Sequence, residues 1–194
     1  MRKVILFMHI SLDGFVCGPN GELDWATMTD DAMGEYMGND LLKTVDTMFV
    51  GRVLFQGFEQ YWPSVPMDPN NKPEMIAFAH WMADTPKIVF SNSLNEVKWK
   101  NSRLAKGSPA EEVKKLKSEP GGDIVIFGGA SLSTIFAEQD LIDEYRFKLE
   151  PVILGSGRSL YKGFPAMRKL KLTHSKSFDS GVVALYYQPV RKAD

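Results

Sequence analysis

The chain has little of several features that mark whole classes of protein. It contains a single cysteine, Cys17, among 194 residues, so it forms no internal disulfide and suits a reducing compartment. No apolar stretch reaches the roughly 18 residues that span a membrane, and no charged and then apolar leader precedes Val4. We therefore expect a cytoplasmic protein with no membrane partner.

Clustered charge is also missing. The formal net charge is -1, and no five like charges follow one another. Binding to nucleic acid phosphates requires clustered Lys and Arg, so we expect no nucleic-acid partner. The three histidines, His9, His80 and His174, do not have the spacing of metal ligands, and we expect no metal site. His9 lies in an apolar run and is predicted to be a core residue.

What the sequence does contain is an alternation of short apolar runs and helix-like segments. Buried strands are predicted at 3–10, 47–50, 87–90 and 123–127, with a weaker strand at 97–99. Helices are predicted at 29–42, 75–83, 109–117 and 131–138, and the proline-rich stretch 62–73 is predicted to be an irregular loop. This order predicts an α/β fold with a mostly parallel central sheet flanked by helices, in one domain over residues 1–194.

The last third of the chain changes character. Residues 144–149 alternate, and the predicted strands 169–178 and 182–188 flank Asp179-Ser180-Gly181, which favours a hairpin turn. We expect an antiparallel C-terminal hairpin at one edge of the sheet. Its strands are apolar enough to pair with a second copy, so a homodimer is the expected assembly.

Residues suited to ligand binding follow four predicted strands: Asp13, Gly51-Arg52, Ser91-Asn92 and Gly128-Gly129. The carboxyl ends of parallel strands open on one edge of a sheet, where ligands bind. A strand that ends in Gly-Gly and enters a helix presents bare N–H groups, which suit a phosphate. Arg52 adds a permanent cation, and Ser91-Asn92 adds donors with no carboxylate nearby. This balance favours NADPH over NADH, whose site usually carries an acidic residue.

Two acids are candidates for proton donation, and an ordered water is the alternative source of the proton. Asp30 lies five residues after Trp25, and a carboxyl group beside an aromatic ring is partly desolvated and easier to protonate. The alternative is that Thr29 or Asp30 caps the helix. Asp13 is the second candidate, with a turn before Gly14 as its alternative. Gly155-Ser156-Gly157-Arg158 lacks the third glycine of a dinucleotide fingerprint and is predicted to be a loop.

The order of these motifs resembles the dihydrofolate-reductase-like superfamily. It is especially similar to stand-alone relatives of the C-terminal domain of the bifunctional riboflavin-biosynthesis deaminase/reductase. The matching motifs are Ser11-Leu12-Asp13-Gly14-Phe15, Val50-Gly51-Arg52, Val89-Phe90-Ser91-Asn92, Phe127-Gly128-Gly129-Ala130, Leu141-Ile142-Asp143-Glu144 and Pro151-Val152-Ile153-Leu154-Gly155-Ser156-Gly157. The resemblance implies a dihydrofolate-reductase-like fold and NADPH-dependent hydride transfer to a small heterocyclic substrate.

The resemblance also implies site residues. Those implied to bind the cofactor are Gly51, Arg52, Val53, Ser91, Asn92, Phe127, Gly128, Gly129, Ala130, Ser131 and Leu132. The loop 13–25, with Gly18 and Trp25, is the implied lid over the nicotinamide. Asp30 falls where dihydrofolate reductases place their substrate-binding acid.

The chain departs from the patterns of the families it resembles at three places. Val53-Leu54-Phe55 stands where dihydrofolate reductases usually have a threonine after Gly-Arg, and the insertion 62–73 has no counterpart. Phe127 stands where the riboflavin-pathway reductases usually carry a glutamate, which argues against their ribosylaminopyrimidine substrate. Three interpretations stay open: a riboflavin-type reductase, a dihydrofolate reductase, and a non-catalytic nucleotide-binding dimer module.

Overall fold

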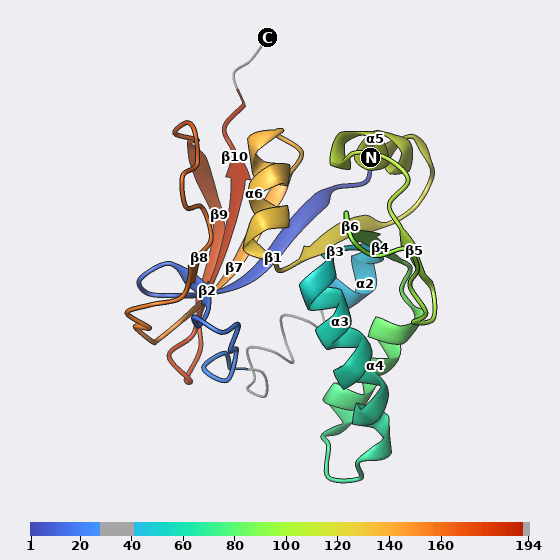
Figure 1. Ribbon diagram of the computed structural model, residues 1–194. Coiled ribbons are helices and arrows are strands. Elements are labelled where there is room, and N and C mark those ends of the chain that lie inside the picture. The colour runs from blue at the N-terminus through green and yellow to red at the C-terminus, as the bar shows by residue number, and fades with distance from the viewer. Residues whose placement is uncertain (28–40, 192–194) are drawn as a thin grey trace.

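The computed structural model describes residues 1–27 and 41–191. Its centre is an eight-stranded sheet in the order β5-β4-β3-β6-β1-β7-β10-β9 (Figure 1). The strands are β1 (Val4–Ser11), β3 (Val45–Gly51), β4 (Lys87–Phe90), β5 (Ser102–Leu104), β6 (Asp123–Phe127), β7 (Glu144–Glu150), β9 (Leu170–Ser177) and β10 (Val183–Pro189). The strands from β5 to β7 run parallel, and β10 and β9 complete the sheet as an antiparallel hairpin. The predicted fold class is confirmed.

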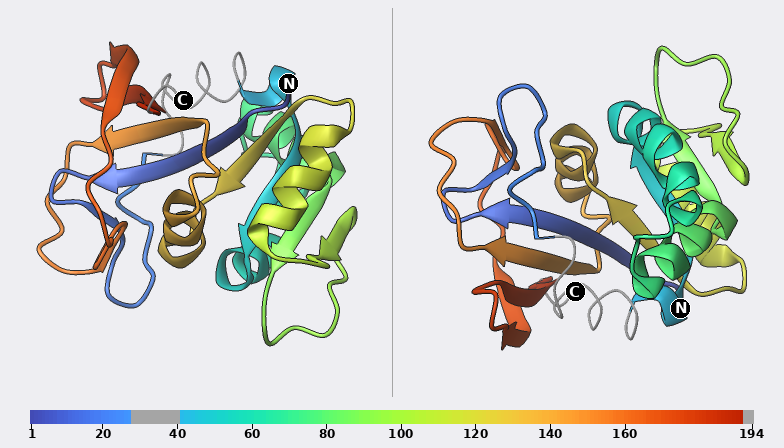
Figure 2. Two further views of the ribbon diagram at one scale, coloured as in Figure 1. Left: turned by 90° about the horizontal axis from the view of Figure 1, so that it is seen from above. Right: turned by 90° about the horizontal axis from the view of Figure 1, so that it is seen from below.

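Helices pack on both faces of this sheet (Figure 2). One face is covered by α3 (Arg52–Tyr61), the 3-10 helix η2 (Trp62–Met67) and α4 (Pro73–Asp84). The other is covered by α5 (Pro109–Ser118) and α6 (Ala130–Glu138), and the short α2 (Leu42–Thr44) precedes β3. None of the helices in the two described ranges is long and apolar enough to cross a membrane.

The central strands are buried on both faces. On β1, Phe7 joins the core beneath α3 and α4, whereas Leu6 joins the core beneath α5 and α6. Their partners on β6, Phe127 and Ile126, divide in the same way. A strand buried on both faces is apolar at every position, which is why continuous apolar runs predicted these strands correctly.

Two predicted elements are wrong. Residues 97–99 form no strand, and the edge of the sheet is β5 instead. Trp99 is buried because its ring packs 6.1 Å from the Phe55 ring and lies 4.4 Å from the ammonium nitrogen of Lys87, so the apolar signal came from a loop. The stretch 62–73 begins as η2 rather than as irregular loop, because a proline fits the first turn of a helix, where no N–H is needed.

A second, two-stranded sheet joins two loops at the open end of β1 and β7. It pairs β2 (Phe15–Cys17) with β8 (Arg158–Ser159), so that Cys17 lies opposite Arg158. A Cβ at Gly157 would lie 2.3 Å from the backbone oxygen of Cys17, so this close pairing requires glycine. The small sheet therefore fixes Arg158 near the carboxyl ends of the central strands.

Candidate functional site

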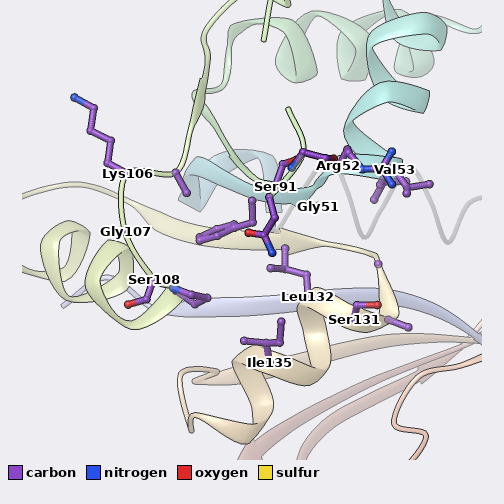
Figure 3. A pocket seen from close by; sticks show the side chains of 18 of the residues that line it. Gly51, Arg52, Val53, Ser91, Lys106, Gly107, Ser108, Ser131, Leu132 and Ile135 are labelled. Atoms are coloured by element: carbon purple, nitrogen blue, oxygen red, sulfur yellow. The ribbon is translucent and has the colours of Figure 1, made fainter. Parts of the chain in front are cut away.

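A cleft of about 680 Å³ opens at the carboxyl ends of β3, β4 and β6. Because these strands run parallel, the residues that follow them meet here. In Figure 3, Gly51, Arg52 and Val53 at the start of α3 face Leu132 and Ile135, whose side chains point from α6 toward the cleft. Residues that follow separate strands, and that were predicted to bind a ligand together, therefore line the same cleft.

Two helix N-termini at this cleft have no side-chain cap. Helix α3 begins after Gly51 and helix α6 after Gly129, and neither N-cap residue provides a capping hydrogen bond. The first N–H groups of a helix, together with its dipole, form an anion site when no side chain closes them. Helix α5 also reaches the cleft, but a capping box between Ser108 and Glu111 closes its N-terminus. An anion would therefore be held by α3 and α6.

The two adjacent glycines have different physical roles. Gly129 has φ 81° and ψ 99°, a conformation that residues with a Cβ avoid, and a Cβ there would meet nothing within 4 Å. Gly128 has φ 51°, and a Cβ there would lie 2.7 Å from Cδ2 of Leu54. Gly128 thus permits close packing against α3, whereas Gly129 leaves open backbone that a ligand can approach.

The cleft is positively charged. Its described lining residues include Arg52, Lys106 and Arg158 and no Asp or Glu. Arg52 donates to the uncharged Oε1 of Gln56 at 3.3 Å, so this bond leaves its charge uncompensated. The Lys106 side chain extends away from the cleft in Figure 3. The two arginines are therefore the cations best placed for an anionic ligand.

A second cavity, of about 450 Å³, adjoins the cleft. The two spaces share Val53, Leu54, Gly129, Ala130 and Arg158. Most of the second cavity is lined by apolar side chains, which are Phe7, Met8, Val16, Leu23, Val53, Leu54, Phe58, Trp62, Phe78, Phe127 and Ala130. The Phe127 ring lies 5.6 Å from the ring of Phe7 and 6.2 Å from that of Phe58, in edge-on contacts. This cavity suits a small ligand with apolar surface.

The structure brings most of the predicted cofactor residues together. Those that line the cleft are Gly51, Arg52, Val53, Ser91, Asn92, Gly129, Ala130, Ser131 and Leu132. Phe127 and Gly128 line the second cavity instead. The Ser91 hydroxyl accepts hydrogen bonds from the backbone N–H groups of Ser93 (3.1 Å) and Leu94 (2.9 Å), which order the loop after β4.

Asp13, one of the two predicted catalytic acids, lies outside the linings of both spaces. Its carboxylate contacts backbone N–H groups of a neighbouring loop. Its carboxylate accepts from the backbone N–H groups of Leu154 (3.1 Å) and Gly155 (2.7 Å). The hydrogen bond from the Ser11 hydroxyl, supported by these backbone bonds, lowers the pKa of Asp13. Asp13 therefore joins the loops that carry β2 and β8.

Gly18 and Trp25, the two residues singled out in the expected lid, also lie outside both linings. The backbone N–H of Gly18 and the indole N–H of Trp25 both donate to the carbonyl oxygen of Glu22, at 3.0 and 3.1 Å, and close the loop on itself. Other residues of this loop line the second cavity, namely Val16, Cys17, Asn20, Gly21 and Leu23. Asp30, the other predicted catalytic acid, lies outside the described residues.

Three features of the site were missed from the sequence. Arg158 lies in Gly155-Ser156-Gly157-Arg158, the motif that was rejected as a dinucleotide fingerprint. Gly157 could have indicated the close backbone pairing that places this arginine at the cleft. His9 lines the second cavity, although it was predicted to be a core residue. The feature that could have indicated this is the presence of an ionisable residue in an apolar strand. The loop 105–109 lines the cleft because buried Glu112 accepts from the backbone N–H of Lys106 at 2.8 Å, and nothing local in the sequence indicates this contact.

This sheet order, with helices on both faces and a closing antiparallel hairpin, is that of the dihydrofolate-reductase-like fold. The chain belongs to the RibD C-terminal domain family, whose model matches residues 2–184. It is 38% identical over 187 residues to the Uncharacterized protein YyaP of Bacillus subtilis (strain 168), a match that covers 96% of this chain and 94% of that protein. The predicted family resemblance is confirmed.

Two solved structures show the shared fold. The first is a protein of Shewanella sp. PV-4 whose name relates it to riboflavin biosynthesis. It matches with a TM-score of 0.73 at 22% identity, over 98% of this chain and 100% of that one. Dihydrofolate reductase from Enterococcus faecalis, solved with NADP(H), matches with a TM-score of 0.59 at 15% identity, over 97% of each chain.

Proposed function

We propose that the protein is an NADPH-dependent reductase that transfers a hydride to a small heterocyclic substrate. The observation that carries this proposal is the acid-free lining of the described cleft, with two uncapped helix N-termini, beside an apolar cavity. Family membership and a dihydrofolate reductase neighbour solved with NADP(H) support it.

The cleft residues fit the cofactor by their chemistry. The helix starts at Gly51 and Gly129 would hold the pyrophosphate, because their N–H groups are uncapped and the Gly129 backbone faces open space. Arg52 and Arg158 would neutralise phosphate charge. Ser91 and Asn92 would lie near the ribose phosphate. The missing carboxylate suits a phosphorylated ribose, which an acidic residue would repel.

The bound cofactor would supply a hydride, which is its own chemistry. The chain's residues would bind and orient the substrate in the second cavity and exclude water from it. Phe127 makes an apolar part of the wall where the riboflavin-pathway reductases usually have an acid, so we propose a flat ring rather than a phosphoribosyl group as the part held there. The substrate 5-amino-6-(5-phosphoribosylamino)uracil is therefore not the one that the cavity favours.

Calorimetric titration with NADPH and NADH tests this proposal. We expect NADPH to bind with a dissociation constant in the micromolar range and NADH about tenfold more weakly or worse. No binding of either nucleotide at about 1 mM would overturn the reductase and the nucleotide-module interpretations alike. If NADPH binds, a screen of pterins and aminopyrimidines for its oxidation separates an enzyme from a binding module.

A further inference from the structure

His9 is an ionisable side chain in the wall of the apolar cavity that cofactor binding does not explain. It follows Phe7 by two residues on β1 and faces the same side of the sheet. Because Phe7 pairs with Phe127, the last residue of β6, His9 lies level with the Gly128-Gly129 turn that follows. The imidazole and both glycines border the same cavity. A ring bound there next to the cofactor cleft is within reach of His9.

Glu150 holds this imidazole in one orientation. Its Oε1 lies 2.8 Å from Nδ1 of His9, and its other oxygen accepts from the backbone N–H of Thr27 at 3.2 Å. The Glu150 side chain is fully buried, while that of His9 is 11% exposed. Burial would raise the pKa of Glu150, but the hydrogen bonds from His9 and Thr27 outweigh it and lower the pKa. A buried carboxylate of this kind stabilises an imidazolium.

Within residues 1–27 and 41–191, the other charged or titratable groups near this pair come from three strands. Lys148 of β7 is paired with His9 in the sheet, and its ammonium group donates to the carbonyl oxygen of Thr27 at 2.8 Å. Arg158 of β8 and Cys17 of β2 line the same cavity. Among these described groups, Glu150 is the acid, and it bonds directly to the imidazole.

We propose that His9, as an imidazolium, is the catalytic acid of the reduction and that Glu150 is its positioning residue. The inference rests on the proposed function and narrows its substrate to a flat ring with a C=N or C=O bond. The carbon of that bond gains the hydride, which carries two electrons from the reduced dinucleotide. The π pair moves to the nitrogen or oxygen, which takes the proton from Nε2 of His9. His9 regains a proton from water.

The test compares His9→Gln and Glu150→Gln with His80→Gln, a control at an exposed histidine on α4. Dihydrofolate, which has a C=N bond in its pterin ring, and phenanthrenequinone, which is flat and has carbonyl groups, are the probe substrates. We expect every variant to bind NADPH within about threefold of wild type. His9→Gln should lose about 10²- to 10⁴-fold in kcat with little change in KM, the usual contribution of a positioned acid. His80→Gln should keep wild-type turnover.

Nitrogen-15 NMR of the imidazole groups supplies a measurement that does not depend on turnover. The probe should shift the His9 resonances and leave those of His80 and His174 in place. In Glu150→Gln the His9 imidazolium should lose its proton at lower pH, because the carboxylate that stabilises it is gone. The basic limb of the kcat profile should move in the same direction.

The outcomes separate the two proposals. A wild-type protein that fails to bind NADPH contradicts the proposed function, whereas the imidazole titration still decides whether Glu150 positions His9. The role of His9 is overturned if His9→Gln keeps turnover within about threefold of wild type. It is also overturned if turnover is lost in Asp30→Asn and in none of the other variants. An unchanged His9 titration in Glu150→Gln overturns the positioning role, and a protein that binds NADPH but neither binds nor reduces the probes overturns the substrate class.

Discussion

Replacing Gly129 by alanine separates ligand contact from backbone strain. Gly129 has φ 81°, and a Cβ there would meet nothing within 4 Å. Gly14 has φ 84° and an equally open Cβ position, but it lines neither the cleft nor the second cavity. The two alanine variants share a positive φ and an open Cβ position and differ in location, so Gly14→Ala is the matched control.

Both variants should lose about 1–2 kcal/mol of stability, the cost of a left-handed conformation for a residue with a Cβ. For a chain of this length that corresponds to a fall in Tm of roughly 2–8 °C. Only Gly129→Ala should also bind NADPH more weakly, because its methyl group occupies the open side of the α6 N-terminus. Loss of one hydrogen bond to a charged phosphate, worth about 1.5–3 kcal/mol, corresponds to a rise of roughly 10- to 150-fold in the dissociation constant.

Calorimetry gives both quantities, from a thermal scan and from a titration at a temperature where each variant is folded. The expected result is a similar fall in Tm for the two variants and a loss of affinity for Gly129→Ala alone. Wild-type affinity in Gly129→Ala would refute the phosphate-binding role of this backbone. Equal losses of affinity in both variants would show that strain, and not ligand contact, is responsible.

Three further predictions follow from other contacts. Arg52→Gln should weaken NADPH binding about tenfold and make the binding less dependent on salt, which titrations at two salt concentrations would measure. Its Tm should stay within about 2 °C of wild type, because the Arg52 side chain is exposed. Phe127→Ala should lower the free energy of unfolding by about 3–5 kcal/mol, measured with denaturant, and a loss below about 1 kcal/mol would contradict the packing of this ring. The hydrogen bond from Arg103 is the main cause that lowers the pKa of Glu112, so the folded chain takes up that proton less readily than the unfolded one. The stability that Glu112 contributes is therefore lost as pH falls below the ordinary value of 4.5, and thermal scans should show a steeper acid loss in wild type than in Glu112→Gln.

The sequence predicted the centre of the molecule well because its signal there is local. Strands buried on both faces are continuous apolar runs, and the parallel order implied that residues after them meet at one edge. Gly51-Arg52, Ser91-Asn92 and Gly129 do meet in one cleft. The edge strand β5 was misplaced because Ser102 and Arg103 are polar, whereas Trp99 in the neighbouring loop is buried.

The parts of the site that were missed depend on contacts between distant segments. Arg158 reaches the cleft through its pairing with Cys17, and His9 is oriented by Glu150 across the neighbouring strand. No local pattern reports such a pairing. The homodimer stays a prediction, and β9, through which it was expected to form, is an exposed edge strand that carries Lys171 and Lys176, a composition that disfavours edge pairing.

A crystal structure of the protein with NADPH would show whether the cleft and the apolar cavity hold the cofactor as we propose. We expect the pyrophosphate at the N–H groups that follow Gly51 and Gly129, and the ribose phosphate near Ser91 and Asn92. We expect the nicotinamide at the boundary with the apolar cavity, on the side of Gly128 and Phe127. A nucleotide bound elsewhere, or one whose nicotinamide points away from that cavity, would contradict the proposed cofactor site.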